Sequence, residues 1–295
     1  MIIKNFLFHR VNPVRDLLWD PMDVGLFDQC IKYLKKNYHV ISLEKNLFSG
    51  ELIKTKKKLA TVMFDDGYVD NIQYAVPVLE KHDCPASFYV VTGCIDHNLP
   101  TWTHIVEHLF LYTNKLEINV ETDSLPPSLK KNKWVDKNER IEFAKQMNPY
   151  LKNLTHENRS SVIMKLQKYF NDVELPKIMM SWKEVKQLND AGFSIGSHSS
   201  SHAMLGTVAD DNEVSNLHDQ ASGRSGNNRL IYFDRFFIAK VDLRFWFQQQ
   251  HSQSGKSQLF QFGLLKRAKL RIDNAHIKFA SISLHRAFGT RNMYA

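Results

Sequence analysis

The chain has few cysteines, no long apolar run and, after Pro176, no proline. Its three cysteines, Cys30, Cys84 and Cys94, are odd in number and contain no C-x-x-C pair. Neither a disulfide framework nor a thiolate zinc cluster is therefore indicated, and a reducing, cytoplasmic compartment is expected. No stretch of about 18 apolar residues is present, so we expect no membrane-spanning helix. Polar residues interrupt residues 1–10 too often for a signal peptide, and this segment predicts a first strand instead.

Basic residues outnumber acidic ones, but only near the end of the chain. The formal net charge is +8, yet residues 220–295 alone carry a net charge of +10 and residues 1–219 carry −2. A nucleic-acid partner requires basic charge spread along a binding face, so we expect none. With 295 residues and 43% hydrophobic content, the chain can form a globular protein with a sizeable core.

Short apolar runs alternate with amphipathic segments over the first 100 residues. Residues 59–64 and 86–91 have the continuous apolar character of buried parallel strands, and residues 40–43 are also expected to be extended. Between the strands, residues 21–39 and 72–79 have apolar positions at helical spacing, the second with an expected kink at Pro77. This alternation predicts an α/β fold with a parallel sheet, in which functional loops gather at the carboxyl ends of the strands.

Residues 100–176 are richer in Lys, Asn and Glu and predict an inserted helical region, with helices over 140–147 and 162–170. We assign this region no chemistry. After it, Ser181 and Glu184 form an S-x-x-E capping box that should open a helix ending near Gly192. Residues 193–197 then predict a short strand that ends immediately before His198.

Two polar motifs follow predicted strands. Asp65, Asp66 and Gly67 come after the strand at 59–64, and His198 and His202 form an H-x-x-x-H pair after the strand at 193–197. Each has an ordinary alternative: Asp-Gly marks turns, and histidines at this spacing also occur on serine-rich surface loops. On a helical turn, however, both imidazoles would share one face. Together with a carboxylate they predict a two-histidine, one-carboxylate metal site with a position left for water.

The motifs that begin at Phe64 and at Ser197 resemble the first and second motifs of the polysaccharide deacetylases, carbohydrate esterase family 4 with its NodB-homology domain. The segment around Phe8 to Val11 is also similar to bacterial members. The resemblance implies a distorted (β/α) barrel and removal of N- or O-acetyl groups from an acetylated glycan. It implies that Asp65 is the catalytic base and that Asp66, His198 and His202 bind a divalent metal ion, for which zinc is our expectation.

The resemblance weakens after residue 206. The family's Arg-x-Pro-Tyr motif is not intact, since Arg229-Leu230-Ile231-Tyr232 lacks the proline, and His285 and His276 are only weak candidates for its late general acid. Proline is absent from the last 119 residues, where a typical frequency gives about six. We therefore divide the chain into a barrel-like part (1–206), an anomalous segment (207–260) that we expect to be poorly packed, and a remnant of the barrel's end (261–295).

Three functions remain open at this point. The first is a metal-dependent glycan deacetylase. The second, a non-haem iron oxygenase, shares two histidines and one carboxylate but needs open positions for O₂, and the tandem aspartates favour hydrolysis instead. The third is an inactive, glycan-binding relic that keeps the metal site without the later motifs.

Overall fold

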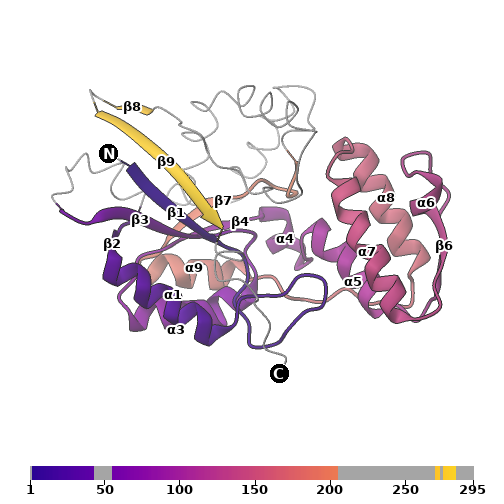
Figure 1. The fold of residues 1–295 in the computed structure, drawn as a ribbon, viewed down its shortest axis with the longest axis horizontal. Helices are drawn as coiled ribbons and strands as arrows, with labels where there is room; N and C mark the ends of the chain where they lie inside the picture. The colour runs from indigo at the N-terminus through magenta and orange to yellow at the C-terminus, as the bar shows by residue number, and fades with distance from the viewer. Residues whose placement is uncertain (1, 43–54, 205–269, 273–274, 284–295) are drawn as a thin grey trace.

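A mainly parallel sheet of seven strands forms the centre of the protein in the computed structural model, which describes residues 2–42, 55–204, 270–272 and 275–283 (Figure 1). The strand order is β7-β4-β3-β1-β9-β8, and β2 also pairs with β3. The strands are β1 (Ile2–Phe8), β2 (Tyr38–Val40), β3 (Lys58–Phe64), β4 (Ser87–Val90), β7 (Ser194–Ser197), β8 (Leu270–Ile272) and β9 (Ala275–Ser283). Only the β8–β9 pair is antiparallel in this sheet.

The sheet confirms the predicted α/β class with a parallel sheet. The predicted strands at 59–64, 86–91 and 193–197 correspond to β3, β4 and β7, and the extended start of the chain is β1. The predicted closure into a barrel is not seen, because no pairing within the described residues joins β7 to β8. The predicted anomalous segment, 207–260, lies outside the described residues.

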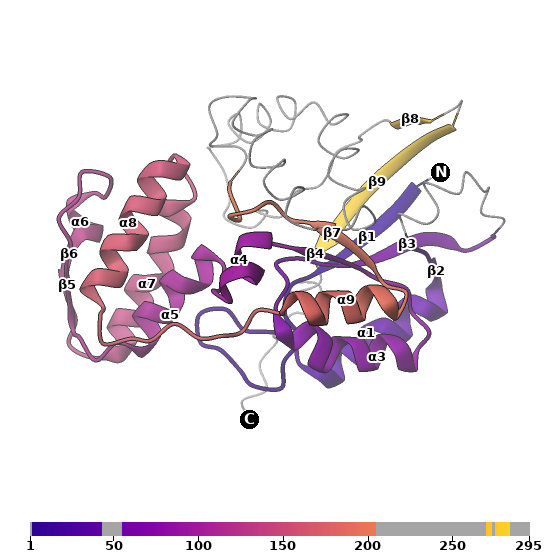
Figure 2. The same cartoon turned by 180° about the vertical axis from the view of Figure 1, so that it is seen from behind.

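One face of the sheet is covered by α1 (Val24–Asn37), α3 (Val76–Lys81) and α9 (Trp182–Asp190), as both views show (Figure 2). Helix α1 begins where the Asp23 carboxylate accepts a hydrogen bond from the Leu26 N–H, and it buries the predicted positions Phe27, Ile31 and Leu34. Helix α9 has the predicted capping box, with both reciprocal bonds between Ser181 and Glu184. These faces and the sheet form one hydrophobic core.

The predicted kink at Pro77 has a different form. A π-helical turn, η1 (Asn71–Ala75), precedes α3, and Pro77 lies in the first turn of α3. Proline is tolerated there because the first amides of a helix have no partner within the helix. The π-turn lies shortly after the Asp65–Asp66 motif.

The region 100–176 folds into helices that lie to one side of the sheet (Figure 1). It contains α5 (Trp102–Tyr112), α6 (Pro127–Lys130), α7 (Lys137–Leu151), α8 (His156–Tyr169) and a two-stranded hairpin of β5 (Glu117–Asn119) and β6 (Lys131–Lys133). Its apolar side chains form a second core of their own. The short helix α4 (Thr92–His97) lies between the sheet and this region. Among the helices described, none combines the length and apolar character needed to cross a bilayer.

Candidate metal centre

The two predicted motifs meet at the carboxyl end of the sheet because β4 lies between β3 and β7. The backbone at the end of β4 binds both of them. The Val91 N–H donates to the Asp66 carbonyl (3.2 Å), and the Val90 carbonyl accepts from the His198 N–H (2.8 Å). Main-chain hydrogen bonds thereby hold residues that are far apart in the sequence beside one another.

Asp66 and Gly67 form a left-handed turn that directs the first motif. Their φ angles are +78° and +89°. A Cβ atom at Gly67 would lie 3.1 Å from Cβ of Val90, so both the backbone conformation and the close approach to β4 require glycine here. Asp66 tolerates a positive φ better than most residues do, and the turn buries its side chain almost completely. The Asp-Gly signal thus marks a turn and a site at once.

The three predicted ligands converge. Nε2 of His202 lies 3.3 Å from Oδ1 of Asp66, Nε2 of His198 lies 3.7 Å from the same oxygen, and one ligand atom from each residue falls within 4.8 Å of the others. A tetrahedral ion with bonds of roughly 2.0–2.1 Å requires ligand atoms about 3.3 Å apart. Oδ1 of Asp66 is buried without a hydrogen-bond partner, which is costly unless a cation satisfies it. The residues present therefore fit a divalent ion.

The histidine pair is not on a helical turn, contrary to our expectation. Residues 198–204 form no helix, and Ser199 and His202 have positive φ angles of 65° and 53°. Main-chain donors at the start of α4 hold this loop: the N–H groups of Thr92 and Gly93 donate to the carbonyls of Ser199 (3.2 Å) and Ser200 (2.9 Å). The two imidazoles approach one oxygen because the loop is folded back, not because of helical periodicity.

Burial controls the protonation of this site. It raises the pKa of Asp66, an effect that His9 and then His198 oppose, and it lowers the pKa of His202 well below its usual range. Burial also raises the pKa of Asp65, and His198 opposes that shift. His202 is consequently a neutral imidazole, which is the form that binds metal ions. Asp65, whose proton affinity is increased, lies outside the converging group.

His9 is a residue near the site that the sequence did not single out for chemistry. It follows β1, which pairs with β3 so that Phe8 faces Phe64, and the Asp65 N–H donates to the Phe8 carbonyl at 3.0 Å. Its charge acts on both Asp66 and His202. The signal was available in principle, since the residue after one parallel strand lies beside the residue after its neighbour. Without strand order, however, no sequence pattern pairs the two positions.

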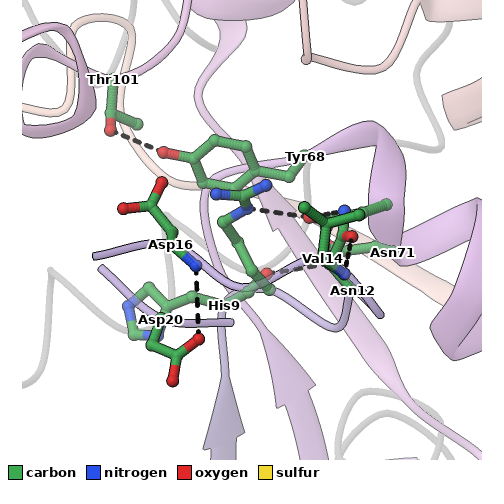
Figure 3. Close-up of polar contacts among 10 residues, drawn as sticks. His9, Asn12, Val14, Asp16, Asp20, Tyr68, Asn71 and Thr101 are labelled. Atoms are coloured by element: carbon green, nitrogen blue, oxygen red, sulfur yellow. Dashed lines mark hydrogen bonds and ion pairs between the residues drawn. The ribbon is translucent and has the colours of Figure 1, made fainter. Parts of the chain in front are cut away.

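The end of β1 is tied to the turn that follows the first motif. Nδ2 of Asn71 donates to the His9 carbonyl (2.8 Å), and the Tyr68 hydroxyl lies 3.0 Å from Oγ1 of Thr101 (Figure 3). Arg10 pairs with Asp70 at 2.8 Å, and its guanidinium lies 5.2 Å from the centre of the Tyr68 ring. Of the weak general-acid candidates, His276 is in β9, where only the backbone is described, and His285 is outside the described residues.

A model of the polysaccharide deacetylase family matches residues 53–222, which include all four predicted site residues. The chain therefore belongs to the polysaccharide deacetylase family, a family of hydrolases. It is also 29% identical over 101 residues to "Putative polysaccharide deacetylase YxkH" of Bacillus subtilis (strain 168). That alignment covers 34% of this chain and 35% of YxkH, so only about a third of the relative is spanned.

Solved structures of deacetylases are similar at low identity. A de-N-acetylase from Aggregatibacter actinomycetemcomitans is 16% identical, with 67% of this chain and 55% of that chain covered and a TM-score of 0.33. The Streptococcus pyogenes deacetylase PplD, in complex with acetate, is 21% identical, with coverages of 57% and 81% and a TM-score of 0.29. At such TM-scores these likenesses add no argument, and the family assignment depends on the family model.

Proposed function

We propose that this protein is a metal-dependent hydrolase that removes acetyl groups from an N-acetylated or O-acetylated glycan. One observation carries the proposal. His198 and His202 converge on Oδ1 of Asp66, a buried oxygen without a hydrogen-bond partner, in a chain of the polysaccharide deacetylase family. We also propose that the sheet closes into a complete barrel of the deacetylase type. Zinc suits the nitrogen and oxygen ligands, as do cobalt, nickel and iron.

In this proposal Asp66, His198 and His202 hold the ion. A divalent ion there would act as a Lewis acid toward the acetyl carbonyl and would lower the pKa of a water molecule. Asp65 would act as the general base and accept a proton from the water whose oxygen attacks the acetyl carbonyl carbon. Adjacent carboxylates repel each other when both are ionised, so charge neutralisation at Asp66 allows Asp65 to remain an anionic base.

The bond to the sugar nitrogen or oxygen then breaks, and the leaving atom needs a proton while acetate departs. His9 is an imidazole outside the proposed ligand set, and its charge acts on Asp66 and His202. Its neighbour Phe8 accepts a hydrogen bond from the Asp65 N–H, which places the start of the segment after β1 beside the first motif. These features make His9 a candidate for the proton donor, beside the late histidine that the family resemblance implies. The role differs from that of His198 and His202, because changing His9 should leave the bound ion in place.

Acetate release from N-acetylated oligosaccharides, measured on protein whose metal content is determined in the same preparation, tests the proposal. We expect acetate to form with the metal-loaded parent and not with the Asp65→Asn variant. Metal binding without acetate from any acetylated glycan would instead support the inactive, glycan-binding relic. The oxygenase alternative predicts O₂ consumption with iron, and no structural observation favours it over hydrolysis.

A further inference from the structure

The first two residues at the start of α5 contact both metal-binding motifs. Thr101, the N-cap residue of α5, has its hydroxyl 3.0 Å from that of Tyr68, which follows the Asp65-Asp66-Gly67 turn. The next residue, Trp102, donates its indole Nε1–H to the His202 carbonyl at 2.9 Å. One helix end thus connects the segment after Asp66 with the second histidine ligand.

The Trp102 bond acts on a strained point of the chain. His202 has a left-handed backbone, which is an unfavourable conformation for a residue with a Cβ atom. The indole N–H of Trp102 donates to the carbonyl of this same residue, His202. Toward the amino end, the loop is held by Thr92 and Gly93, which bind the carbonyls of Ser199 and Ser200. Trp102 supplies the corresponding restraint at the His202 end.

Trp102 is itself fixed by a buried arginine of the helical region. Cζ of Arg159, in α8, lies 5.0 Å from the centre of the Trp102 ring, and the side chain of Arg159 is among the largest that are fully buried. Its Nη1 donates to the Leu154 carbonyl at 3.0 Å, which anchors the guanidinium within α8 and the turn before it. The cation–π attraction between a guanidinium and the indole face favours the ring orientation seen here.

We propose that Trp102, held by Arg159, is a positioning residue of the metal site, through which the helical region 100–176 sets the orientation of His202. The inference rests on the proposed metal-binding function. It assigns a role to a region in which the sequence showed no chemistry. Groups that orient a metal ligand typically change metal affinity by about 10- to 100-fold when they are removed.

The same helical core offers matched controls. Trp134 is also buried there, but its indole Nε1 has no hydrogen-bond partner, so Trp134→Phe removes an N–H without removing a bond. Arg140 is a second buried arginine, with Nη1 donating to the Lys115 carbonyl at 2.8 Å. Trp102→Phe and Arg159→Met can therefore be compared with Trp134→Phe and Arg140→Met, which make changes of the same kind within the region.

Two measurements on the full chain decide the matter. The first is the Zn²⁺ dissociation constant, obtained by competition with a chromophoric chelator. We expect Trp102→Phe to raise it about 10-fold and Arg159→Met to raise it in the same direction, with both controls unchanged. The second is hydrogen exchange of residues 198–204 in metal-free protein, which Trp102→Phe should accelerate and Trp134→Phe should not. Thermal unfolding of each variant separates local effects from global destabilisation.

The outcomes distinguish this inference from the proposed function. If Trp102→Phe and Arg159→Met match their controls in both measurements, the positioning role is wrong, whatever the parent binds. If the parent binds no Zn²⁺ but Trp102→Phe still loosens residues 198–204, the metal assignment fails and the positioning of the loop stands. If Trp102→Phe does not fold, the Arg159→Met and Arg140→Met pair decides by the same criteria.

Discussion

Oδ1 of Asp66 lies 3.3 Å from Nε2 of His202, and no hydrogen bond satisfies this buried oxygen. Burial makes ionisation of Asp66 costly, because it raises the pKa of that carboxyl, and it lowers the pKa of His202 so that the imidazole stays uncharged. The pair therefore does not form an ordinary salt bridge. A carboxylate and a neutral imidazole at this separation are instead complementary to a third partner, a divalent cation.

We expect one divalent ion per folded chain. His198→Ala should lower the bound metal well below one equivalent, because it removes one of the three ligands proposed among the described residues. Elemental analysis after reconstitution with excess Zn²⁺ measures this. His39→Ala, at an exposed position in β2, is the control and should retain the ion. A parent with almost no metal, or a His198→Ala variant as loaded as the parent, would contradict the site.

The paired aspartates should fail differently when each is changed to Asn. Asp65→Asn should keep the ion but lose turnover by roughly 10²- to 10⁴-fold, the usual contribution of a general base. Asp66→Asn should lose metal affinity and turnover together, because it replaces a ligand. Metal content and acetate release are measured on the same samples, with parent protein as the reference. Full activity in Asp65→Asn would show that the base lies elsewhere.

The site ligands were predictable from sequence because short strands label the residues that follow them. β3 is a mostly apolar, buried run, and β7 is a short extended segment that follows the predicted helix α9. The polar residues immediately after these strands are Asp65, Asp66 and His198. The geometry that joins them was not predictable. It depends on the β4 backbone and on left-handed residues such as Ser199, for which the sequence has no periodic signal. Helical spacing predicted the two histidines that converge with Asp66, but the loop that brings them together is not helical.

The contacts of Trp102 and Arg159 could not be predicted from the sequence. Both belong to helices whose apolar positions are explained by the second core, so nothing in their pattern points to a site elsewhere. Trp102 contacts His202, and Arg159 contacts Trp102, in each case between segments far apart in the chain. Such contacts follow from how the helical region packs on the sheet, and a single sequence does not encode that in any local period.

Gly93 should be needed for the histidine loop to reach the site. A Cβ atom at this position would lie 2.4 Å from the Ser200 carbonyl oxygen, which Gly93 itself binds through its N–H. Gly93→Ala must therefore push residues 198–202 away, and we expect a loss of Zn²⁺ affinity of about 10-fold or more. Gly25→Ala, in α1, is the matched control. Its Cβ would lie 3.2 Å from a side-chain atom only, and affinity should be retained.

A Gly93→Ala variant with the parent's affinity would mean that the loop accommodates the methyl group without moving the ligands. Thermal unfolding of the metal-free proteins is needed beside the titration, since overpacking of this kind commonly costs about 1–3 kcal/mol of stability. A variant that unfolds early but binds Zn²⁺ normally when folded would separate the packing role of Gly93 from its role in the site.

Glu107 should make the stability of the protein depend on pH. Its carboxylate, on α5, accepts a hydrogen bond from Nδ2 of Asn148 at 2.9 Å, and burial raises its pKa from 4.5 to about 7. The native state thus retains a proton that the unfolded chain releases above pH 4.5. The stability from this group is complete below about pH 4.5 and is lost as the pH rises through 7.

Glu107→Gln mimics the protonated form at every pH and keeps an acceptor for Asn148. We expect it to be more stable than the parent at pH 8, by roughly 3 to 4 kcal/mol at about 1.4 kcal/mol per pKa unit, and nearly equal to the parent near pH 4.5. Thermal unfolding across this range measures the difference. Burial also lowers the pKa of His104 to about 3, which has the opposite effect on how stability depends on pH. Both proteins contain His104, so its effect cancels in the comparison.

The control is Glu121→Gln, at an exposed position, which should change stability at neither pH. A stability difference independent of pH would show that Glu107 titrates normally in the folded protein.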